Sequence, residues 1–275
     1  MAYENLGEGA LDYYPCRYGK SKLLFRGPRR NLEDNYVAFL GGTETYGKFL
    51  ERPFPALVEE EIGTVCVNFG YVNAGVDVFA NEPEVLGACS RARATVIQVM
   101  GAQNMSNRFY AVHPRRNDRF VCASRLMKTI FRDVDFTDFS FTRHMLHELQ
   151  ALSQERFAIV RDELKEAWVG RMRRLLARIE GKTVLLWFAA HSPDEADSFG
   201  ALGRDPLFID REMIEEVRSH ATHVVEVVVR APEADRPGDG LVYSPLEEPA
   251  TRGMLGATAH AAVAARLAEV LPEVI

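Results

Sequence analysis

Short apolar runs that alternate with helical segments are the feature that most constrains the fold of this sequence. Five of these runs are the right length for buried strands, and they cover residues 36–40, 64–68, 94–100, 183–188 and 222–229. The segments between and after them have helical spacing or helix boundary residues, most clearly at 154–179 and 257–271. Strand and helix in repetition are typical of a doubly wound sheet. We therefore predict an α/β fold with a mainly parallel, five-stranded sheet.

Two segments do not follow this alternation. Residues 1–35 are rich in Tyr, Gly, Pro and Arg and have no sustained period, so we expect a lead-in segment laid over the domain. Residues 105–150 are rich in Arg, Asn, Phe and His, and we expect a partly helical insertion after the third strand. A length of 275 residues suits a single α/β domain, 1–275, that carries both additions.

Composition excludes several classes of protein. A net charge of -6 argues against a nucleic-acid binder, which needs a basic face to neutralise phosphates. No run reaches the ~18 apolar residues of a membrane span, and the first residues lack the pattern of a secretory signal. The four cysteines are widely spaced and form no CxxC pair, so no metal or redox site is indicated. We expect a cytoplasmic protein without metal, cofactor, nucleic-acid or membrane partner, and the sequence indicates no oligomeric state.

Three strand ends carry small and polar residues together, and the second strand runs into Phe-Gly at 69–70 and Asn-Ala-Gly at 73–75. The first strand runs into Gly-Gly-Thr-Glu-Thr-Tyr-Gly at 41–47, which presents Thr43 and Thr45 where a helix should begin. The third strand runs into Gly-Ala-Gln-Asn at 101–104. In an open α/β sheet, ligands bind at the carboxyl ends of the strands. We therefore predict a ligand site at this edge of the sheet.

The order of these motifs resembles the SGNH, or GDSL-like, hydrolase superfamily. Residues 41–47 resemble its first block, Gly-Asp-Ser-x-Thr-x-Gly, and Gly70 or Gly75 matches the glycine of its second block. Residues 101–104 approach its third block, Gly-x-Asn-Asp, and His260 stands where a histidine opens the last helix. Longer phrases around 39–49 and 99–110 resemble an uncharacterised bacterial family known only as a domain of unknown function. The superfamily resemblance implies a flavodoxin-like sheet and an esterase, lipase or acyltransferase.

The resemblance also implies roles for individual residues. Thr43 would supply the hydroxyl nucleophile and His260 the base that removes its proton. The backbone N–H of Gly70 and the side chain of Asn104 would stabilise an oxyanion. Thr43 replaces the serine of the first block and Gly42 replaces its aspartate. In the superfamily an acid usually stands three residues before the histidine, but here that position is Ala257. Asp77, Glu247 or Glu248 would therefore have to orient His260 through space.

Each candidate also has a purely structural interpretation. Thr43 and Thr45 can cap a helix, and Asn104 can bond its own turn. His260 can simply open an alanine-rich helix. Gly42, Thr45 and His191 also enter as ligand contacts at the strand ends, and His191 has the structural alternative of a loop histidine.

Arginines offer a different site. Arg115, Arg116 and Arg119, beside His113, form a basic run that is either a solvated face or, joined by Arg29 and Arg30, an anion site. Three functions therefore remain open from the sequence. The first is an SGNH-like hydrolase or acyltransferase acting on a small-molecule or saccharide ester. The second is a transferase with an anionic sulfo- or nucleotide-linked donor, and the third is a non-catalytic binding protein on the same fold.

Overall fold

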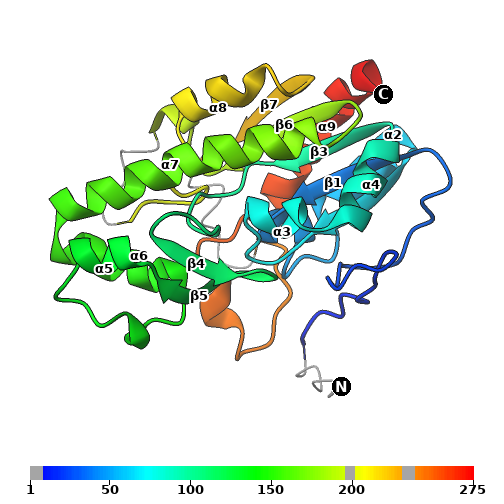
Figure 1. Cartoon of the computed structure of the whole chain (residues 1–275). Coiled ribbons are helices and arrows are strands. Elements are labelled where there is room, and N and C mark those ends of the chain that lie inside the picture. Colours follow the sequence, from blue (N-terminus) through cyan, green and yellow to red (C-terminus); the bar gives the residue numbers. More distant parts are fainter. Residues whose placement is uncertain (1–8, 196–201, 231–238) are drawn as a thin grey trace.

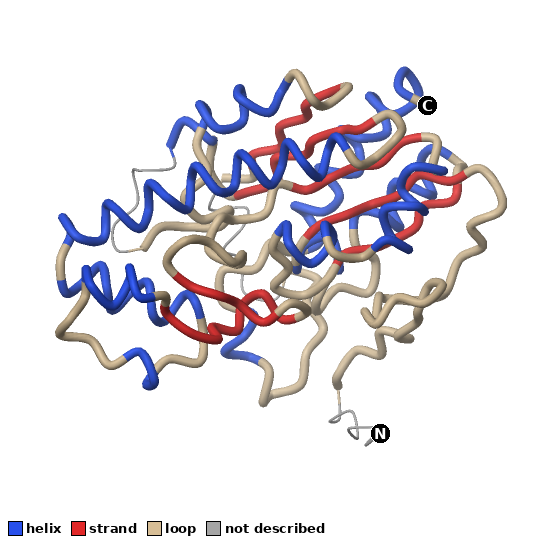
Figure 2. Tube along the Cα trace, in the orientation of Figure 1, coloured by secondary structure: helices blue, strands red, loops and turns tan. Residues whose placement is uncertain are grey.

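A parallel five-stranded sheet forms the centre of the computed structural model, which describes residues 9–195, 202–230 and 239–275. The strands are β1 (Tyr36–Gly41), β2 (Val65–Gly70), β3 (Ala94–Gln98), β6 (Thr183–Ala189) and β7 (His223–Val228). Their order is β2-β1-β3-β6-β7, and every neighbouring pair is parallel (Figures 1 and 2). This order reverses direction at β1, as in flavodoxin-like sheets. The predicted doubly wound α/β fold is confirmed.

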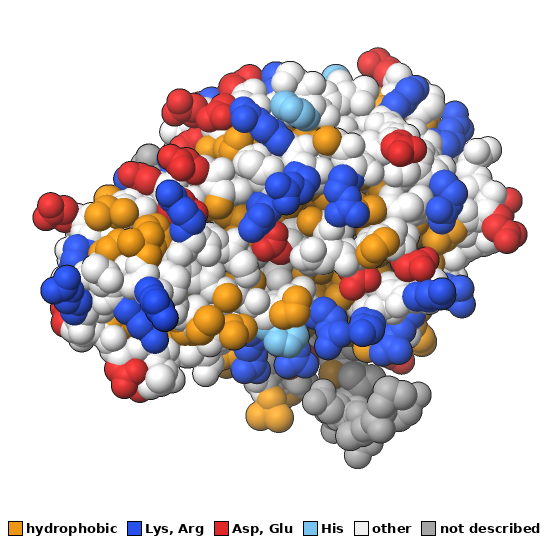
Figure 3. All heavy atoms as spheres, viewed as in Figure 1, with side chains coloured by type: hydrophobic (Ala, Val, Ile, Leu, Met, Phe, Trp, Pro, Cys, Tyr) orange, Lys and Arg blue, Asp and Glu red, His pale blue; other side chains and the backbone are white. Residues whose placement is uncertain are grey.

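Alternate residues of β1 serve two hydrophobic cores because successive strand side chains point to opposite faces. Val37 and Phe39 pack toward the two helices α2 (Phe54–Ile62) and α9 (Ala257–Val274). Ala38 and Leu40 pack on the other face. That face is covered by the helices α3 (Val76–Ala80), α4 (Pro83–Arg91), α7 (Gln154–Ala177) and α8 (Arg211–Arg218). On the side that α7 covers, acidic and basic side chains are interspersed (Figure 3).

The insertion is helical only in part. It opens with an antiparallel hairpin of β4 (Tyr110–His113) and β5 (Arg116–Ala123), which the sequence interpretation did not foresee. Three short helices follow: α5 (Arg125–Ile130), the 3-10 helix η1 (Phe136–Asp138) and α6 (Thr142–Leu152). The hairpin, α5 and α6 lie together beside the sheet (Figure 1). Buried Asn117 joins the hairpin to α3, because its Oδ1 accepts the N–H groups of Gly75 and Val78.

The lead-in, of which the structure describes residues 9–35, contributes no strand to the five-stranded sheet. Its side chains Tyr18 and Phe25 are buried against Phe69 of β2, with ring centroids 5.0 and 5.3 Å away. Arg26 is also buried, and its guanidinium donates to the carbonyls of Leu50 at 2.6 Å and Glu51 at 2.7 Å. It reaches the carbonyls of residues 46 and 47 as well. Arg26 thus fixes the chain that follows the first strand-end turn.

Across the three described ranges, no helix is both long and apolar enough to cross a lipid bilayer.

Candidate functional site

A pocket of about 600 Å³ lies at the carboxyl ends of β1, β3 and β6. Thr43 and Glu44 line it from the turn after β1, and Gln103 and Asn104 line it from the turn after β3. Ala189 and Ala190 line it from the end of β6. The two turns singled out in the sequence therefore meet in one cavity, whose volume is in the range of small-molecule sites.

Thr43 begins a single helical turn, α1 (Thr43–Tyr46). The helix is capped by Gly42 without a side-chain bond, so Thr43 is not its N-cap. The Thr43 hydroxyl exchanges hydrogen bonds with Asn73, donating to Oδ1 at 3.3 Å and accepting from the backbone N–H at 3.0 Å. Asn73 also lines the pocket and donates its Nδ2 to Asp118 at 3.2 Å. Thr43 faces the pocket, but the partner of its hydroxyl is an amide, which is not a base.

Gln98, at the end of β3, holds this turn in place. Its Oε1 accepts three hydrogen bonds: from the Gly42 N–H at 3.1 Å, the Thr45 N–H at 3.2 Å and the Thr45 hydroxyl at 2.6 Å. Thr45 is fully buried and does not line the pocket. Gly42 does line it, with its N–H occupied by Gln98. The sequence signal for Gln98 was a single amide in an otherwise apolar strand.

Glu44 is a pocket carboxylate that the sequence interpretation missed. Gln98 Nε2 donates to Glu44 Oε2 at 3.0 Å. Burial raises the pKa of Glu44 above its ordinary value, and the nearby negative charge of Asp205 raises it further, while the bond from Gln98 lowers it. A carboxyl group with a raised pKa in a pocket takes up and releases its proton at a higher pH than an ordinary glutamate, which suits it to general acid–base catalysis.

Asn104 lies in the pocket wall, where both ends of its amide are used. Its Nδ2 donates to the carbonyl of Asn73 at 3.1 Å, and its Oδ1 accepts from the Thr142 hydroxyl at 2.8 Å. The side chain is only 8% exposed. Asn104 thus connects the turn after β3 to the loop after β2 and to the insertion, in addition to lining the cavity.

The arginines of the pocket are not the ones predicted. Arg143, Arg204 and Arg252 line it, whereas Arg115, Arg116 and Arg119 are exposed on the hairpin and do not. Arg119 lies over the ring of Phe141, 4.8 Å from the centroid. Arg29 and Arg30 line a separate surface depression with Arg91, and Arg30 pairs with Glu59. The predicted basic run therefore does not form part of the strand-end pocket.

His260 does not line the pocket. It is 1% exposed, and its ring packs against Phe54 and Phe188 at centroid distances of 5.6 and 5.2 Å. Its Nδ1 accepts the backbone N–H of Phe54 at 3.0 Å. Burial, reinforced by the positive charge of Arg26, lowers the pKa of His260 to about 3.

The carboxylates considered as orienters of His260 have other partners. Asp77 pairs with Arg171 at 2.9 Å, and Glu247 accepts from the Ser244 hydroxyl at 2.9 Å. Glu248 begins the 3-10 helix η3 (Glu248–Thr251) and is exposed. The structure therefore gives His260 a buried setting beside aromatic rings, outside the pocket lining to which Thr43 and Asn104 belong.

Two further candidates also lie outside the pocket lining. The Gly70 N–H donates to Asn68 Oδ1 at 2.7 Å, so it is not available to an oxyanion. A Cβ at Gly70 would lie 2.2 Å from the Tyr46 nitrogen, which shows that the glycine is needed for packing against α1. His191 is 2% exposed and lies edge-on to Trp187, 5.5 Å between centroids.

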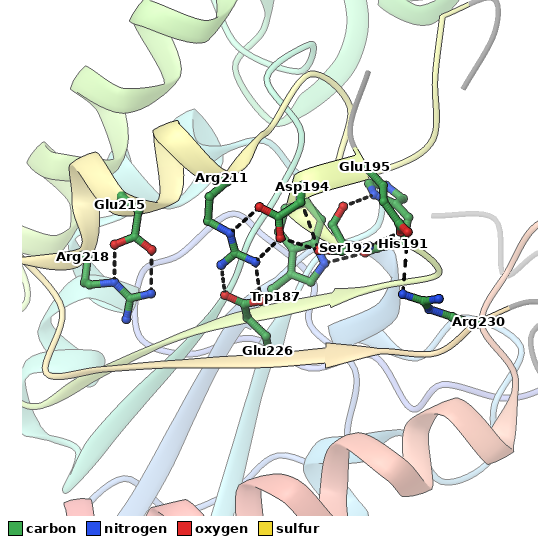
Figure 4. A network of polar contacts seen from close by, with 10 residues as sticks. All are labelled: Trp187, His191, Ser192, Asp194, Glu195, Arg211, Glu215, Arg218, Glu226 and Arg230. Carbon is green, nitrogen blue, oxygen red and sulfur yellow. Dashed lines mark hydrogen bonds and ion pairs between the residues drawn. The ribbon is translucent and has the colours of Figure 1, made fainter. Parts of the chain in front are cut away.

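A network of ion pairs and hydrogen bonds, with His191 at one side of it, anchors the chain after β6 (Figure 4). Arg211 of α8 binds Asp194 at 2.8 Å, in the 3-10 helix η2 (Pro193–Glu195), and also binds Glu226 of β7. Hydrogen bonds from Arg211 and from Ser192 lower the pKa of Asp194 to about 2. The network holds the segment that follows Ala189 and Ala190 of the pocket wall.

Metal ligands do not gather in the part of the chain that the structure describes. No group of three or more His, Cys, Asp or Glu side chains there could hold a metal ion.

The sheet order and the strand-end pocket define a flavodoxin-like, doubly wound α/β protein. Residues 1–275 match the family described as "Domain of unknown function (DUF6473)", and the chain belongs to that family. The predicted membership of an uncharacterised family is thereby confirmed. No curated protein matches the sequence significantly.

Solved structures that are similar to this chain include a carbohydrate esterase, a lipase and a member of a lipolytic family. A carbohydrate esterase family 2 enzyme from Corynascus thermopiles has a TM-score of 0.46 and 12% identity, covering 90% of this chain and 69% of that one. The lipase Lip_vut3 from goat rumen metagenome has a TM-score of 0.42 and 12% identity, with 85% and 96% covered. A lipolytic G-D-S-L family member from Veillonella parvula has a TM-score of 0.41 and 11% identity, with 87% and 99% covered.

Proposed function

We propose that this protein binds a small polar ester in the strand-end pocket and hydrolyses it or transfers its acyl group. The observation that carries the proposal is the meeting of the 41–47 and 101–104 turns in one cavity of about 600 Å³. Hydrogen-bonding side chains, a carboxylate of raised pKa and arginines line the same cavity. These are the groups that acyl transfer needs for proton transfer and for stabilising a developing oxyanion.

Glu44, rather than His260, is the proton-transfer group in this proposal. The Glu44 carboxylate removes a proton from water, or from an acceptor alcohol, as that oxygen bonds to the ester carbonyl carbon. The carbonyl electron pair moves onto its oxygen, where the positively charged pocket wall stabilises it. When the carbon–oxygen bond to the leaving group breaks, the leaving alkoxide takes the proton from Glu44. The carboxylate is thereby regenerated, and the step is balanced without a covalent intermediate.

Thr43 is proposed as a ligand contact. Its hydroxyl is hydrogen-bonded to Asn73, whose amide cannot remove the proton. The described pocket lining contains no histidine that could act as a base instead. Asn104 and Gly42 are assigned to the same wall, where Asn104 positions the Asn73 backbone. Gly70, Thr45, His191 and His260 take structural roles in this proposal, since their polar groups face the protein interior.

Turnover of 4-nitrophenyl acetate by the full-length protein tests the assignment. We expect Glu44→Gln to lower kcat by about two to four orders of magnitude, the usual worth of general acid–base catalysis. Glu60→Gln is the matched control, because Glu60 is an exposed glutamate of α2 paired with Arg52. Thr43→Ala should cost about tenfold or less. Full activity of Glu44→Gln would contradict the role of Glu44. An acyl group on Thr43, detected by mass spectrometry in the wild type and absent in Thr43→Ala, would show that the reaction instead uses a covalent mechanism.

A second candidate is a non-catalytic binding protein on the same fold. The observation that favours it is the burial of His260 outside the pocket lining, with a pKa of about 3. A binding protein would show no turnover with any ester, yet a ligand at a hundred times its dissociation constant would add about 2.7 kcal/mol to the free energy of unfolding. Measurable turnover that depends on Glu44 excludes this candidate.

A further inference from the structure

We infer that the ligand of this pocket carries an oxyanion group, a carboxylate, phosphate or sulfate, which Arg252 binds. The inference rests on the proposed use of the strand-end pocket and adds the class of ligand. It concerns arginines other than the basic run that the sequence suggested.

The pocket wall is more basic than the protein as a whole. Among the residues that the structure describes, three arginines and two carboxylates line it: Arg143, Arg204, Arg252, Glu44 and Asp205. With both carboxylates ionised, these side chains leave one excess positive charge, although the chain carries a net charge of -6. A cleft whose sign is opposite to that of the whole molecule concentrates ligands of complementary charge. Anions are therefore the ligands that this lining favours.

Asp205 is paired with Arg143, so it does not occupy Arg252. Its Oδ2 accepts from Arg143 Nη1 at 2.7 Å, and its Oδ1 accepts from Gln103 Nε2 at 3.2 Å. Arg143 completes its own bonding with the carbonyl of Gly203 at 2.9 Å. These contacts build Arg143 and Asp205 into the wall as a neutral pair.

Arg252 is different. It is exposed at the pocket, between η3 and the start of α9, and its guanidinium makes no ion pair or hydrogen bond with any residue in the described ranges. It can therefore bind a ligand without giving up an internal partner. The planar fork of a guanidinium matches the two oxygens of a carboxylate, phosphate or sulfate.

The rest of the wall indicates what accompanies the anionic group. Apolar residues line the pocket beside the arginines: Val99, Met100, Phe188, Ala189 and Leu255. A short hydrocarbon segment can lie against these side chains while a terminal anion meets Arg252. The structure thus favours a small ester with a charged end, such as the half-ester of a dicarboxylic acid or an ester that bears phosphate or sulfate.

Binding of simple anions tests the inference without any turnover. The melting temperature of the full-length protein is measured with succinate, inorganic phosphate or sulfate, at an ionic strength kept constant with sodium chloride. We expect at least one anion to raise it, and the identity of that anion tells carboxylate from phosphate and sulfate. The increase should vanish in Arg252→Gln and persist in Arg266→Gln, an exposed α9 arginine paired with Glu269. No increase with any anion, or an increase that Arg252→Gln retains, overturns the inference.

A pair of esters separates this inference from the proposed function. Mono-4-nitrophenyl succinate carries a free carboxylate, and its methyl ester is the neutral counterpart. We expect kcat/KM to be about tenfold higher for the charged ester, which corresponds to the lower range for a hydrogen bond to a charged group. Arg252→Gln should remove this preference and leave turnover of the neutral ester unchanged. If neither ester is turned over but anions bind through Arg252, the proposed function fails and the inference stands. If both esters are turned over equally, the inference fails and the function stands.

Discussion

The imidazole Nδ1 of His260 accepts the backbone N–H of Phe54 at 3.0 Å, across 206 residues of sequence. Phe54 is the first residue of α2, which has no side-chain cap of its own. The first N–H groups of a helix have no partner inside the helix. His260 of α9 therefore supplies the cap of α2 from the other end of the chain, and this role requires its Nδ1 to be unprotonated.

This role predicts how stability depends on pH. The pKa of His260 is about 3 in the folded protein and about 6.5 when the chain is unfolded. Between these pH values the unfolded state binds more protons than the folded state. The contribution of His260 to stability is therefore fully present above pH 6.5 and is lost as the pH is lowered. Between pH 7 and pH 5 we expect His260 to account for a loss of about 2 kcal/mol. Urea unfolding of wild type and His260→Asn at both pH values measures it, and equal losses in the two proteins would contradict the assignment.

Glu44 should affect activity and stability in opposite directions. Because its pKa is raised, kcat/KM should increase with pH through a midpoint above the ordinary glutamate value, as the carboxylate forms. The folded state binds the extra proton there, so ionisation lowers stability as the pH rises. Glu44→Gln is therefore expected to lose activity and to be more stable than wild type at pH 7. Activity profiles and urea unfolding check both effects, and a pH-independent kcat/KM in the wild type would count against Glu44 as the base.

Replacing Gln98 should loosen the first strand-end turn. Gln98→Met keeps the length of the side chain but leaves two backbone N–H groups and the Thr45 hydroxyl without their acceptor. We expect a loss of about 3 kcal/mol in the free energy of unfolding, as for buried groups deprived of a partner. Gln154→Met, on an exposed helix position, is the control and should change stability little. A Gln98→Met protein as stable as the wild type would show that water or a shifted turn replaces the amide.

Two glycine substitutions should have opposite effects. In Gly70→Ala the new Cβ would lie 2.2 Å from the Tyr46 nitrogen and 2.6 Å from the Thr45 carbonyl carbon, both of them backbone atoms. We expect strong destabilisation and a displaced α1. In Gly170→Ala, within α7, no atom lies within 4 Å of the new Cβ, and we expect about 0.5–1 kcal/mol of added stability. Thermal unfolding compares the two, and a Gly70→Ala protein with the melting temperature of the wild type would contradict the packing argument.

The sheet was predictable because its strands obey simple local rules. Apolar runs such as Val37–Leu40 end at glycines, and long helices such as α7 show a clear apolar stripe. The β4–β5 hairpin was not predictable in the same way. Its buried positions include the polar Asn117, and its exposed positions include Val121, so the usual alternation of apolar and polar residues is obscured.

The candidate site was predictable in location and less so in chemistry. Strand ends meet at one edge of a parallel sheet, and this rule correctly brings residues 41–47 and 101–104 together. The direction of each side chain depends on tertiary contacts, which is why Glu44 and Gln98 were missed. His260 could have been assigned to the core, because it shares a helical face with Val263, Ala264 and Leu267, all of which are buried.

The buried guanidinium of Arg26 has a consequence for the order in which the site is assembled. Its acceptors lie only 20 to 25 residues further along the chain, so the loop that it closes is short and entropically inexpensive. Gln98 reaches the same turn from 53 to 56 residues away. Contacts of low sequence separation form faster than distant ones. We therefore expect the segment after Thr43 and Glu44 to take shape with the lead-in, before β3 arrives to complete the pocket.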